Sequence, residues 1–142
     1  MSQFYTVSNM LYEFKVKVER ENAKGEMKQV TEHYIIDNCE LFAEVEAKAL
    51  EEFGGDCDVF AIARSKIREI VNAKEVCKPF FKATVVDTFT DDDGNEKETK
   101  YQMLVCAKDI ADANKIMTEY LKQGYDTRLD SLSKTKIVDI LV

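Results

Sequence analysis

The sequence predicts an α+β fold built from two tandem β-β-α-β repeats, each with a mainly antiparallel sheet and one helix packed on one face of it. Three pairs of similar segments indicate the repeat. They are FKVKV at 14–18 with FKATV at 81–85, GEMK at 25–28 with GNEK at 94–97, and KIREIV at 66–71 with KIVDIL at 136–141. Both halves also show the same order of hydrophobic patterns. We expect repeats at about 11–71 and 80–142, joined by a linker at 72–79, within a single domain spanning 1–142.

The first two strands of each repeat are predicted to form a hairpin. In the first repeat, apolar residues occupy the even positions from 12 to 18 and charged residues occupy the odd positions from 13 to 19. This alternation is typical of a strand with one buried face and one wet face. Polar turns that contain glycine follow at 22–25 and 91–95, and we expect second strands at about 28–37 and 97–107.

A helix follows the hairpin in each repeat. In the first repeat we expect Asp37 to open a capping motif with Glu40, and Gly54 to end the helix. In the second repeat Asp109 is the expected cap and Gly124 the expected end.

The third strands, at about 59–71 and 129–142, are long, and we expect them to be bent or bulged. The hairpin makes the first two strands antiparallel, and a helical crossover returns the third strand in the direction of the second. The third strand therefore pairs beside the first, which gives the order 2-1-3 in each repeat. The two repeats are expected to combine as one continuous sheet or by packing together, and open edges also allow a homodimer.

Three stretches carry a resemblance to a known family. They are FKVKVERENAKGEMKQVTEHYIIDN at 14–38, DVFAIARSKIREIV at 58–71 and FFKATVVDTFTDDDGNEKETKYQMLVCAKDIADANK at 80–115. The chain resembles a family of uncharacterised proteins, a domain of unknown function, from gut Bacteroidetes and their tailed, crAss-like phages. The resemblance implies a phage or bacterial cytoplasmic setting, and it implies no catalytic residues.

Composition and charge exclude several classes of protein. The 142 residues include 27 acidic and 20 basic ones, and the net charge of -7 disfavours a general polyanion binder. Apolar runs are too short for a membrane span and the N-terminus lacks a signal-peptide pattern, so we expect a soluble intracellular protein with no membrane partner. Together with what the resemblance implies, the expected location is the cytoplasm of a bacterial host cell. The four cysteines are separated by 17 or more residues, which predicts free thiols and no metal site.

Catalytic chemistry is not predicted. The glycines lie in turns and at helix ends, so no phosphate-binding loop is indicated. The segment 91–95 looks like a calcium loop, but counting from Gly94 places Phe89 and Lys100 at the first and last ligand positions. A nucleophile would need a histidine base, and the single His33 lies in a predicted strand. We therefore expect a protein that is not an enzyme and needs no cofactor.

The predicted strands carry most of the basic residues on their polar register. Nine bases lie there against two acids, Glu13 and Glu19, which gives this face a balance of +7 and leaves -14 for the rest of the chain. The nine are Lys15, Lys17, Arg64, Lys66, Arg68, Lys82, Lys100, Lys134 and Lys136. Thr31, His33, Thr84 and Gln102 add hydrogen-bonding groups, and the aromatic residues Phe60, Phe80 and Tyr125 are expected to lie beside this face.

Two functions fit this pattern. A basic sheet face with aromatic neighbours favours a non-catalytic protein that binds single-stranded DNA or RNA, in which the bases contact phosphates and the rings stack on nucleobases. The alternative is a protein-protein interaction or assembly module of phage or bacterial origin, which dimerises through strand edges or the apolar part of the free face. A small-molecule sensor or enzyme between the repeats would need a pocket with convergent polar groups, which the sequence does not indicate.

Overall fold

The computed structural model describes residues 6–7, 11–55, 57–72, 79–122 and 126–141, and within them it contains nine strands and two helices. Their bounds are β1 Thr6–Val7, β2 Tyr12–Glu21, β3 Met27–Ile36, α1 Phe42–Phe53, β4 Asp58–Arg64, β5 Ile67–Val71, β6 Phe80–Thr90, β7 Glu96–Cys106, α2 Ile110–Leu121, β8 Thr127–Lys134 and β9 Ile137–Leu141. The predicted α+β class is confirmed, with two similar β-rich halves that each carry one helix. Within the described ranges, no helix combines the length and the apolar character needed to cross a membrane.

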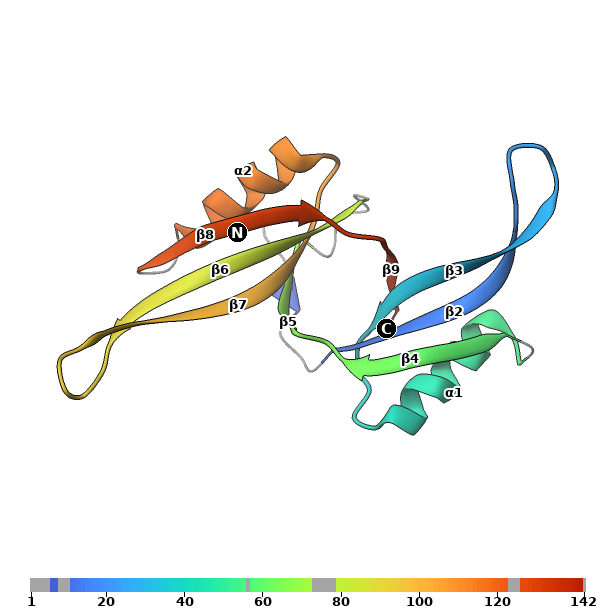
Figure 1. Cartoon of the computed structure of the whole chain (residues 1–142), viewed down its shortest axis with the longest axis horizontal. Helices are drawn as coiled ribbons and strands as arrows, with labels where there is room; N and C mark the ends of the chain where they lie inside the picture. Colours follow the sequence, from blue (N-terminus) through green and yellow to red (C-terminus); the bar gives the residue numbers. More distant parts are fainter. Residues whose placement is uncertain (1–5, 8–10, 56, 73–78, 123–125, 142) are drawn as a thin grey trace. The chain divides into compact units, whose positions relative to one another are not determined.

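The chain divides into two compact units, which we name after their helices. The α1 unit comprises Asn9–Ser65 and Lys136–Val142, and its sheet has the strand order β4-β2-β3-β9. The α2 unit comprises Met1–Ser8 and Lys66–Thr135, and its sheet has the order β1-β5-β7-β6-β8. We call these sheets the α1 sheet and the α2 sheet (Figure 1).

Both sheets contain the predicted order 2-1-3. In the α1 sheet, β2 pairs antiparallel with β3 on one side and with β4 on the other. In the α2 sheet, β6 pairs in the same way with β7 and β8. The hairpin and the helical crossover therefore fix the strand order in each repeat, as their connectivity requires.

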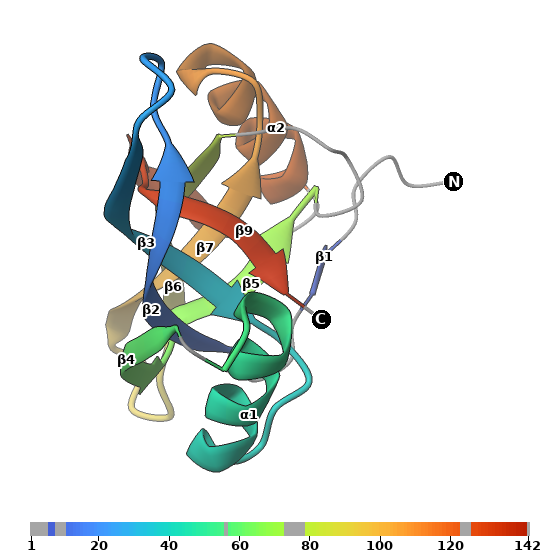
Figure 2. The ribbon, with the colours of Figure 1, turned by 90° about the vertical axis from the view of Figure 1, so that its right-hand side faces the viewer.

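The third strand of each repeat is broken, and its second half joins the other sheet. In the first repeat β4 ends at Arg64, and β5 then pairs in parallel with β7 of the α2 sheet. In the second repeat β8 ends at Lys134, and β9 pairs in parallel with β3 of the α1 sheet (Figure 2). The expectation of bent or bulged third strands is confirmed. The described residues form two sheets that exchange a strand, and the single continuous sheet that was one of our two expectations is wrong.

Each unit has its own core between its sheet and its helix. The alternation predicted for β2 is confirmed, because Phe14 and Val16 are fully buried while Lys15 and Lys17 are exposed. The buried side chains form one cluster in each unit. The α1 cluster contains Tyr12, Phe14, Val16, Val18, Tyr34, Ile36, Cys39, Val45 and Ala49. The α2 cluster contains Val71, Phe81, Ala83, Val85, Met103, Val105, Ala107, Ala113 and Met117. Since each fully buried large side chain contributes about 1.5–3 kcal/mol, these clusters hold one helix against one sheet in each unit.

The two helices begin differently. In α2 the predicted cap is confirmed, because the Asp109 carboxylate accepts a hydrogen bond from the Asp112 backbone N–H at 2.7 Å. In α1 the predicted cap is wrong, because the helix begins at Phe42 and the residue in the capping position is Leu41. Asp37 lies too far upstream, and its backbone N–H donates to Leu141 O at the end of β9. The predicted end at Gly54 is confirmed, and Gly124 lies outside the described residues.

Both hairpins close through an Asx-type turn. The Asn22 side-chain oxygen accepts hydrogen bonds from the backbone N–H groups of Lys24 and Glu26, each at 2.9 Å. In the second hairpin the Asp91 carboxylate accepts from Asp93 and Asn95 at 3.0 and 2.8 Å. The acidic segment 91–95 is therefore a hairpin turn, in which the side chain at its first position mimics a backbone turn.

Candidate nucleic-acid interface

The face of the α1 sheet that points away from α1 carries the best-formed group of predicted residues. Residues directly opposite each other on paired strands share a face, so the register assigns each side chain to one side of the sheet. On β2, the exposed residues Lys15 and Lys17 alternate with the buried residues of the α1 core. They therefore lie on the face opposite the helix.

The neighbouring strands place two rings beside Lys15. Lys15 is paired with Phe60 on β4 and with His33 on β3, and Lys17 is paired with Asp58 and Thr31 on the same two strands. Five of these residues contribute cations, rings or a hydroxyl group to one patch. We call Lys15, Lys17, Thr31, His33 and Phe60 the Lys15 surface.

Contacts within the Lys15 surface distinguish its two lysines. The Lys17 ammonium lies 5.5 Å from the centre of the Phe60 ring, within the range of a cation–π interaction, and 4.0 Å from an Asp58 carboxylate oxygen. Lys15 forms no ion pair with any residue in the part of the chain that the structure describes. Lys15 is therefore the less neutralised of the two cations.

The His33 ring is held by an acid on the same face. His33 Nε2 and Glu13 Oε1 are 2.8 Å apart, and the Ser65 hydroxyl also donates to Glu13. Glu13 thus has hydrogen-bonding partners on both of its oxygens, and the imidazole is fixed in place beside Lys15. About a quarter of the His33 side chain remains exposed, at 27%.

A network on the opposite face fixes β3 beside β2. The Arg20 guanidinium donates to both Glu32 carboxylate oxygens, at 2.8 and 3.2 Å, and the Tyr34 hydroxyl donates to Glu32 at 2.8 Å. The hydrogen bond from Arg20 lowers the pKa of Glu32, and burial together with the contact to Glu32 raises the pKa of Tyr34 to about 12. Because side chains alternate along a strand, fixing Glu32 and Tyr34 on the α1 side directs Thr31 and His33 to the Lys15 surface.

The limits of the Lys15 surface are apolar on one side and acidic on the other. Past Lys15 and His33, Ile35 and Ile137 are buried, at 0% and 8% exposure. Toward the hairpin turn, the next residues of β2 on this face are Glu19 and Glu21. The surface is therefore small, and its positive charge is confined to the two lysines.

Residues 10–142 match a family model described as a domain of unknown function, DUF4494. The chain belongs to this family. The resemblance to an uncharacterised family is thereby confirmed, and the family description names no ligand or activity. No curated protein and no solved structure matches the chain.

Two of the predicted bases of this DUF4494 chain lie on the wrong face because of bulges. Arg64 is paired with the buried Tyr12, and Lys134 is paired with the buried Phe81, so both are on the helix side of their sheets. In β4 the register shifts near Ala61, which has a φ of 55°, and in β8 Asp130 is the extra residue. One inserted residue reverses the alternation, so every later side chain changes face.

Three further bases of the DUF4494 chain are also outside the predicted face. Arg68 occupies a bulge in β5, and its guanidinium carbon lies 4.6 Å from the centre of the Tyr101 ring, which packs against the α2 core. Burial raises the pKa of Tyr101, in keeping with that position. Lys66 and Lys136 lie between strands, in the connections from β4 to β5 and from β8 to β9, so strand pairing assigns neither of them to a face of a sheet.

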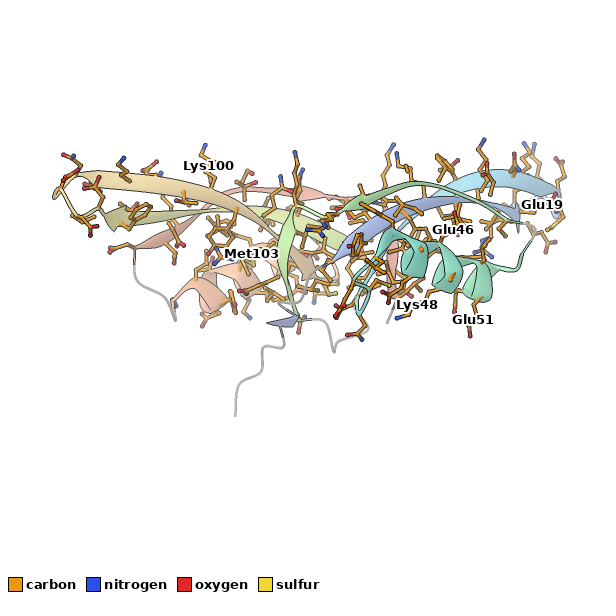
Figure 3. All side chains as sticks on the ribbon, turned by 90° about the horizontal axis from the view of Figure 1, so that it is seen from below. Glu19, Glu46, Lys48, Glu51, Lys100 and Met103 are labelled. Carbon is orange, nitrogen blue, oxygen red and sulfur yellow. The ribbon has the colours of Figure 1, made fainter. Side chains whose placement is uncertain are left out.

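The α2 sheet keeps two predicted bases on its free face, but acids accompany them. Lys82 and Lys100 lie on the face away from α2, and Figure 3 shows Lys100 pointing away from the helix while Met103 points toward it. Lys100 is 3.6 Å from Asp130, and Arg128 is 3.1 Å from Glu98 on the same face. Among the described residues this face carries three bases (Lys82, Lys100, Arg128) and three acids (Glu96, Glu98, Asp130). The predicted balance of +7 for one basic face is therefore wrong.

Of the three predicted aromatic residues, only Phe60 lies in the Lys15 surface. Phe80 is on the free face of the α2 sheet, but it is buried at 3% exposure and has no surface for stacking. Tyr125 lies outside the described residues. In the second repeat, Lys82 and Thr84 on β6 are paired with Ser133 and Ser131 on β8, so no ring stands opposite them. The ring flanked by lysines is thus found in the α1 unit.

Proposed function

We propose that the chain is a non-catalytic protein that binds single-stranded nucleic acid through the Lys15 surface. The observation that supports this most strongly is the Phe60 ring, which has Lys15 directly opposite it and the Lys17 ammonium at 5.5 Å. A ring with adjacent cations on an exposed sheet face is a standard arrangement for stacking a nucleobase while its phosphates are neutralised. Sequence-tolerant binding is expected, because every base offers a face for stacking.

The size of the surface sets the expected strength. Stacking on one aromatic residue contributes about 1–3 kcal/mol, and two lysines neutralise only two phosphates. The chain as a whole has a net charge of -7, so the remaining surface repels a polyanion. We expect a dissociation constant of about 10⁻⁵ M at low salt, which weakens as salt is added.

Fluorescence anisotropy with a labelled oligonucleotide of roughly 12 nucleotides tests the proposal, using oligo-dT and oligo-U at about 50 mM salt. Replacing both Lys15 and Lys17 by Gln should weaken binding by about tenfold or more. Lys82→Gln with Lys100→Gln is the matched control, because it removes the same charge from the free face of the α2 sheet. Absence of binding by the unaltered protein, or equal losses in the two double variants, would contradict the proposal.

The setting that we propose is the cytoplasm of a bacterial cell, with a gut Bacteroidetes or crAss-like phage origin for the chain. This part of the proposal is supported by the resemblance carried by the segments 14–38, 58–71 and 80–115. A bacterial or phage-infected cytoplasm contains abundant single-stranded RNA and DNA intermediates, which a weak sheet-face binder would meet there.

A second candidate function is protein assembly, and the starts of the helices favour it. Leu41 and Phe42 at the start of α1 are 63% and 52% exposed, and Ile110 at the equivalent position of α2 is 50% exposed. Exposed apolar residues at matching positions are typical of contact surfaces. Light scattering across a concentration series tests this: a dimer that dissociates in Leu41→Asn, and persists in Ile110→Asn, would place the contact at α1. A monomeric mass at all concentrations would contradict it.

A further inference from the structure

Three residues of the Lys15 surface form a row that runs across the strands of the sheet. Phe60, Lys15 and His33 stand side by side on β4, β2 and β3, in one row that crosses the three strands. Neighbouring strands are about 4.8 Å apart, so the two rings lie about 10 Å from each other with the lysine between them. Two rings with one cation midway match two nucleobases joined by one phosphodiester.

We infer that the Lys15 surface binds a dinucleotide step of a single strand that crosses β4, β2 and β3, with one base on Phe60, the phosphodiester at Lys15 and the next base on His33. The inference rests on the proposed function and adds the path of the strand, the second stacking residue and the size of the footprint.

A nucleic-acid strand that ran along β2, parallel to the protein strand, would meet unfavourable charges. A strand that followed β2 would pass from the two lysines to Glu19 and Glu21 in one direction and to Glu13 in the other. Acids at both ends repel phosphates, whereas the row across the strands contains one cation and two rings. Crossing the sheet therefore leads the strand away from Glu19 and Glu21, and the one acid of β2 beside this row, Glu13, is already bonded to His33 and Ser65.

The two lysines take different parts on this path. Lys17 already has Asp58 at 4.0 Å and the Phe60 ring at 5.5 Å, so part of its charge is satisfied within the protein. Lys15 is paired with the two rings of the row and forms no ion pair within the described ranges. Lys15 is accordingly the contact for the phosphodiester inside the step, and Lys17, which flanks the Phe60 ring, is left for the next phosphate of a longer strand.

His33 is fixed well enough to serve as a stacking surface. Its Nε2 atom is tied to Glu13 at 2.8 Å, and Glu13 is tied in turn to Ser65. A ring held by such contacts loses little side-chain freedom when a base stacks on it. Past His33 the row reaches the buried Ile137 on β9, which ends the path, while β4 is an edge strand. The protein therefore contacts a single dinucleotide step, and the rest of a longer strand leaves the sheet at the β4 edge.

Amide NMR titrations of the full chain with a mononucleotide and a dinucleotide test the inference, because they detect weak binding and report folding in the same spectra. The probes are thymidine monophosphate and the dinucleotide pTpT, with the corresponding uridine compounds as the RNA arm. In the unaltered protein the dinucleotide should bind about tenfold more tightly than the mononucleotide. His33→Ala should remove this difference, and His33→Phe, which keeps a ring but loses the bond to Glu13, should retain it.

The outcomes separate the inference from the proposed function. If longer oligonucleotides bind and Phe60→Leu weakens them, but both His33 variants leave the dinucleotide advantage unchanged, the crossing path is wrong and the proposed function stands. If both His33 variants are folded and both lose the advantage, His33 acts through its hydrogen bond and the stacking role is wrong. If no oligonucleotide binds the unaltered protein, the proposed function itself fails. Equal affinities for the thymidine and uridine compounds would support the inference, because stacking on the rings and contact with the phosphodiester do not distinguish DNA from RNA.

Discussion

The missing cap of α1 offers a quantitative test of how the helices are stabilised. The two helices are both 12 residues long and begin at equivalent points of the repeat, but only α2 has a capping side chain, that of Asp109. The side chain of Leu41 has no hydrogen-bonding group, and the residue is 63% exposed. We predict that Leu41→Asn stabilises the protein relative to Leu41→Ala, because both variants lose the same leucine contacts and only asparagine supplies a cap.

The expected difference is about 1 kcal/mol, the usual difference between Asn and Ala in a capping position. Asparagine is preferred to aspartate here because Glu40 and Glu44 flank the position, and a further negative charge would be repelled. Asp109→Ala is the complementary variant, and it should lose about 1 kcal/mol by leaving the Asp112 N–H without its acceptor.

Urea denaturation followed by circular dichroism measures both changes. With a slope of about 2 kcal/mol per molar urea, a difference of this size moves the midpoint by about 0.5 M. Equal midpoints for Leu41→Asn and Leu41→Ala, together with a normal loss in Asp109→Ala, would refute the assignment of Leu41 to the capping position of α1.

Three further predictions concern stability and reactivity. Hydrogen bonding lowers the pKa of Glu32 in the folded state, so the ionised carboxylate stabilises the protein at neutral pH and this stabilisation is lost as the pH falls. Glu32→Gln should therefore reduce the difference in the free energy of unfolding between pH 7 and pH 3 by about 0.5 kcal/mol, as measured by urea midpoints at the two pH values. Ala61 has a φ of 55°, so Ala61→Gly should stabilise by about 0.5 kcal/mol, whereas Ala63→Gly should destabilise, and the reverse order would be inconsistent with the bulge. Burial raises the pKa of the Cys39 thiol, so Cys39 should react with a thiol reagent more slowly than the half-buried Cys57, as measured by mass spectrometry of labelled peptides.

The repeat and the strand order within each half follow from local information. The alternation on β2, the glycine turns and the apolar stripes of the helices are each contained in a short stretch of sequence. A hairpin and a helical crossover then leave few ways to order three strands, so 2-1-3 could be predicted.

The exchange of β5 and β9 could not be predicted in the same way. A short strand such as Ile67–Val71 is suited to either sheet, because its three apolar residues indicate only that part of the strand is buried. What decides its partner is the break at Ser65 and Lys66, where the chain leaves β4. Nothing in those two residues marks a change of sheet, since neither glycine nor proline occurs there.

In the candidate site, the sheet face of a residue was predicted correctly where the strand alternates regularly and wrongly beyond a bulge. Lys15 and Lys17 were placed correctly because β2 alternates without interruption in their vicinity. Arg64 and Lys134 were misplaced because each follows a bulge, and an alanine at a φ of 55° carries no signal in its residue type. Asp58 was overlooked as an acid beside Lys17 because the predicted third strand began only at residue 59, whereas β4 begins at Asp58.

The salt dependence of oligonucleotide binding tests the central claim most directly, because it counts the phosphates that the protein neutralises. For single strands, the logarithm of the binding constant falls with the logarithm of salt by about 0.7 for each phosphate contacted. Two lysines at the Lys15 surface predict a slope of about -1.4 for the unaltered protein and about -0.7 for Lys15→Gln. A slope that Lys15→Gln leaves unchanged would contradict the claim that this surface binds single-stranded nucleic acid.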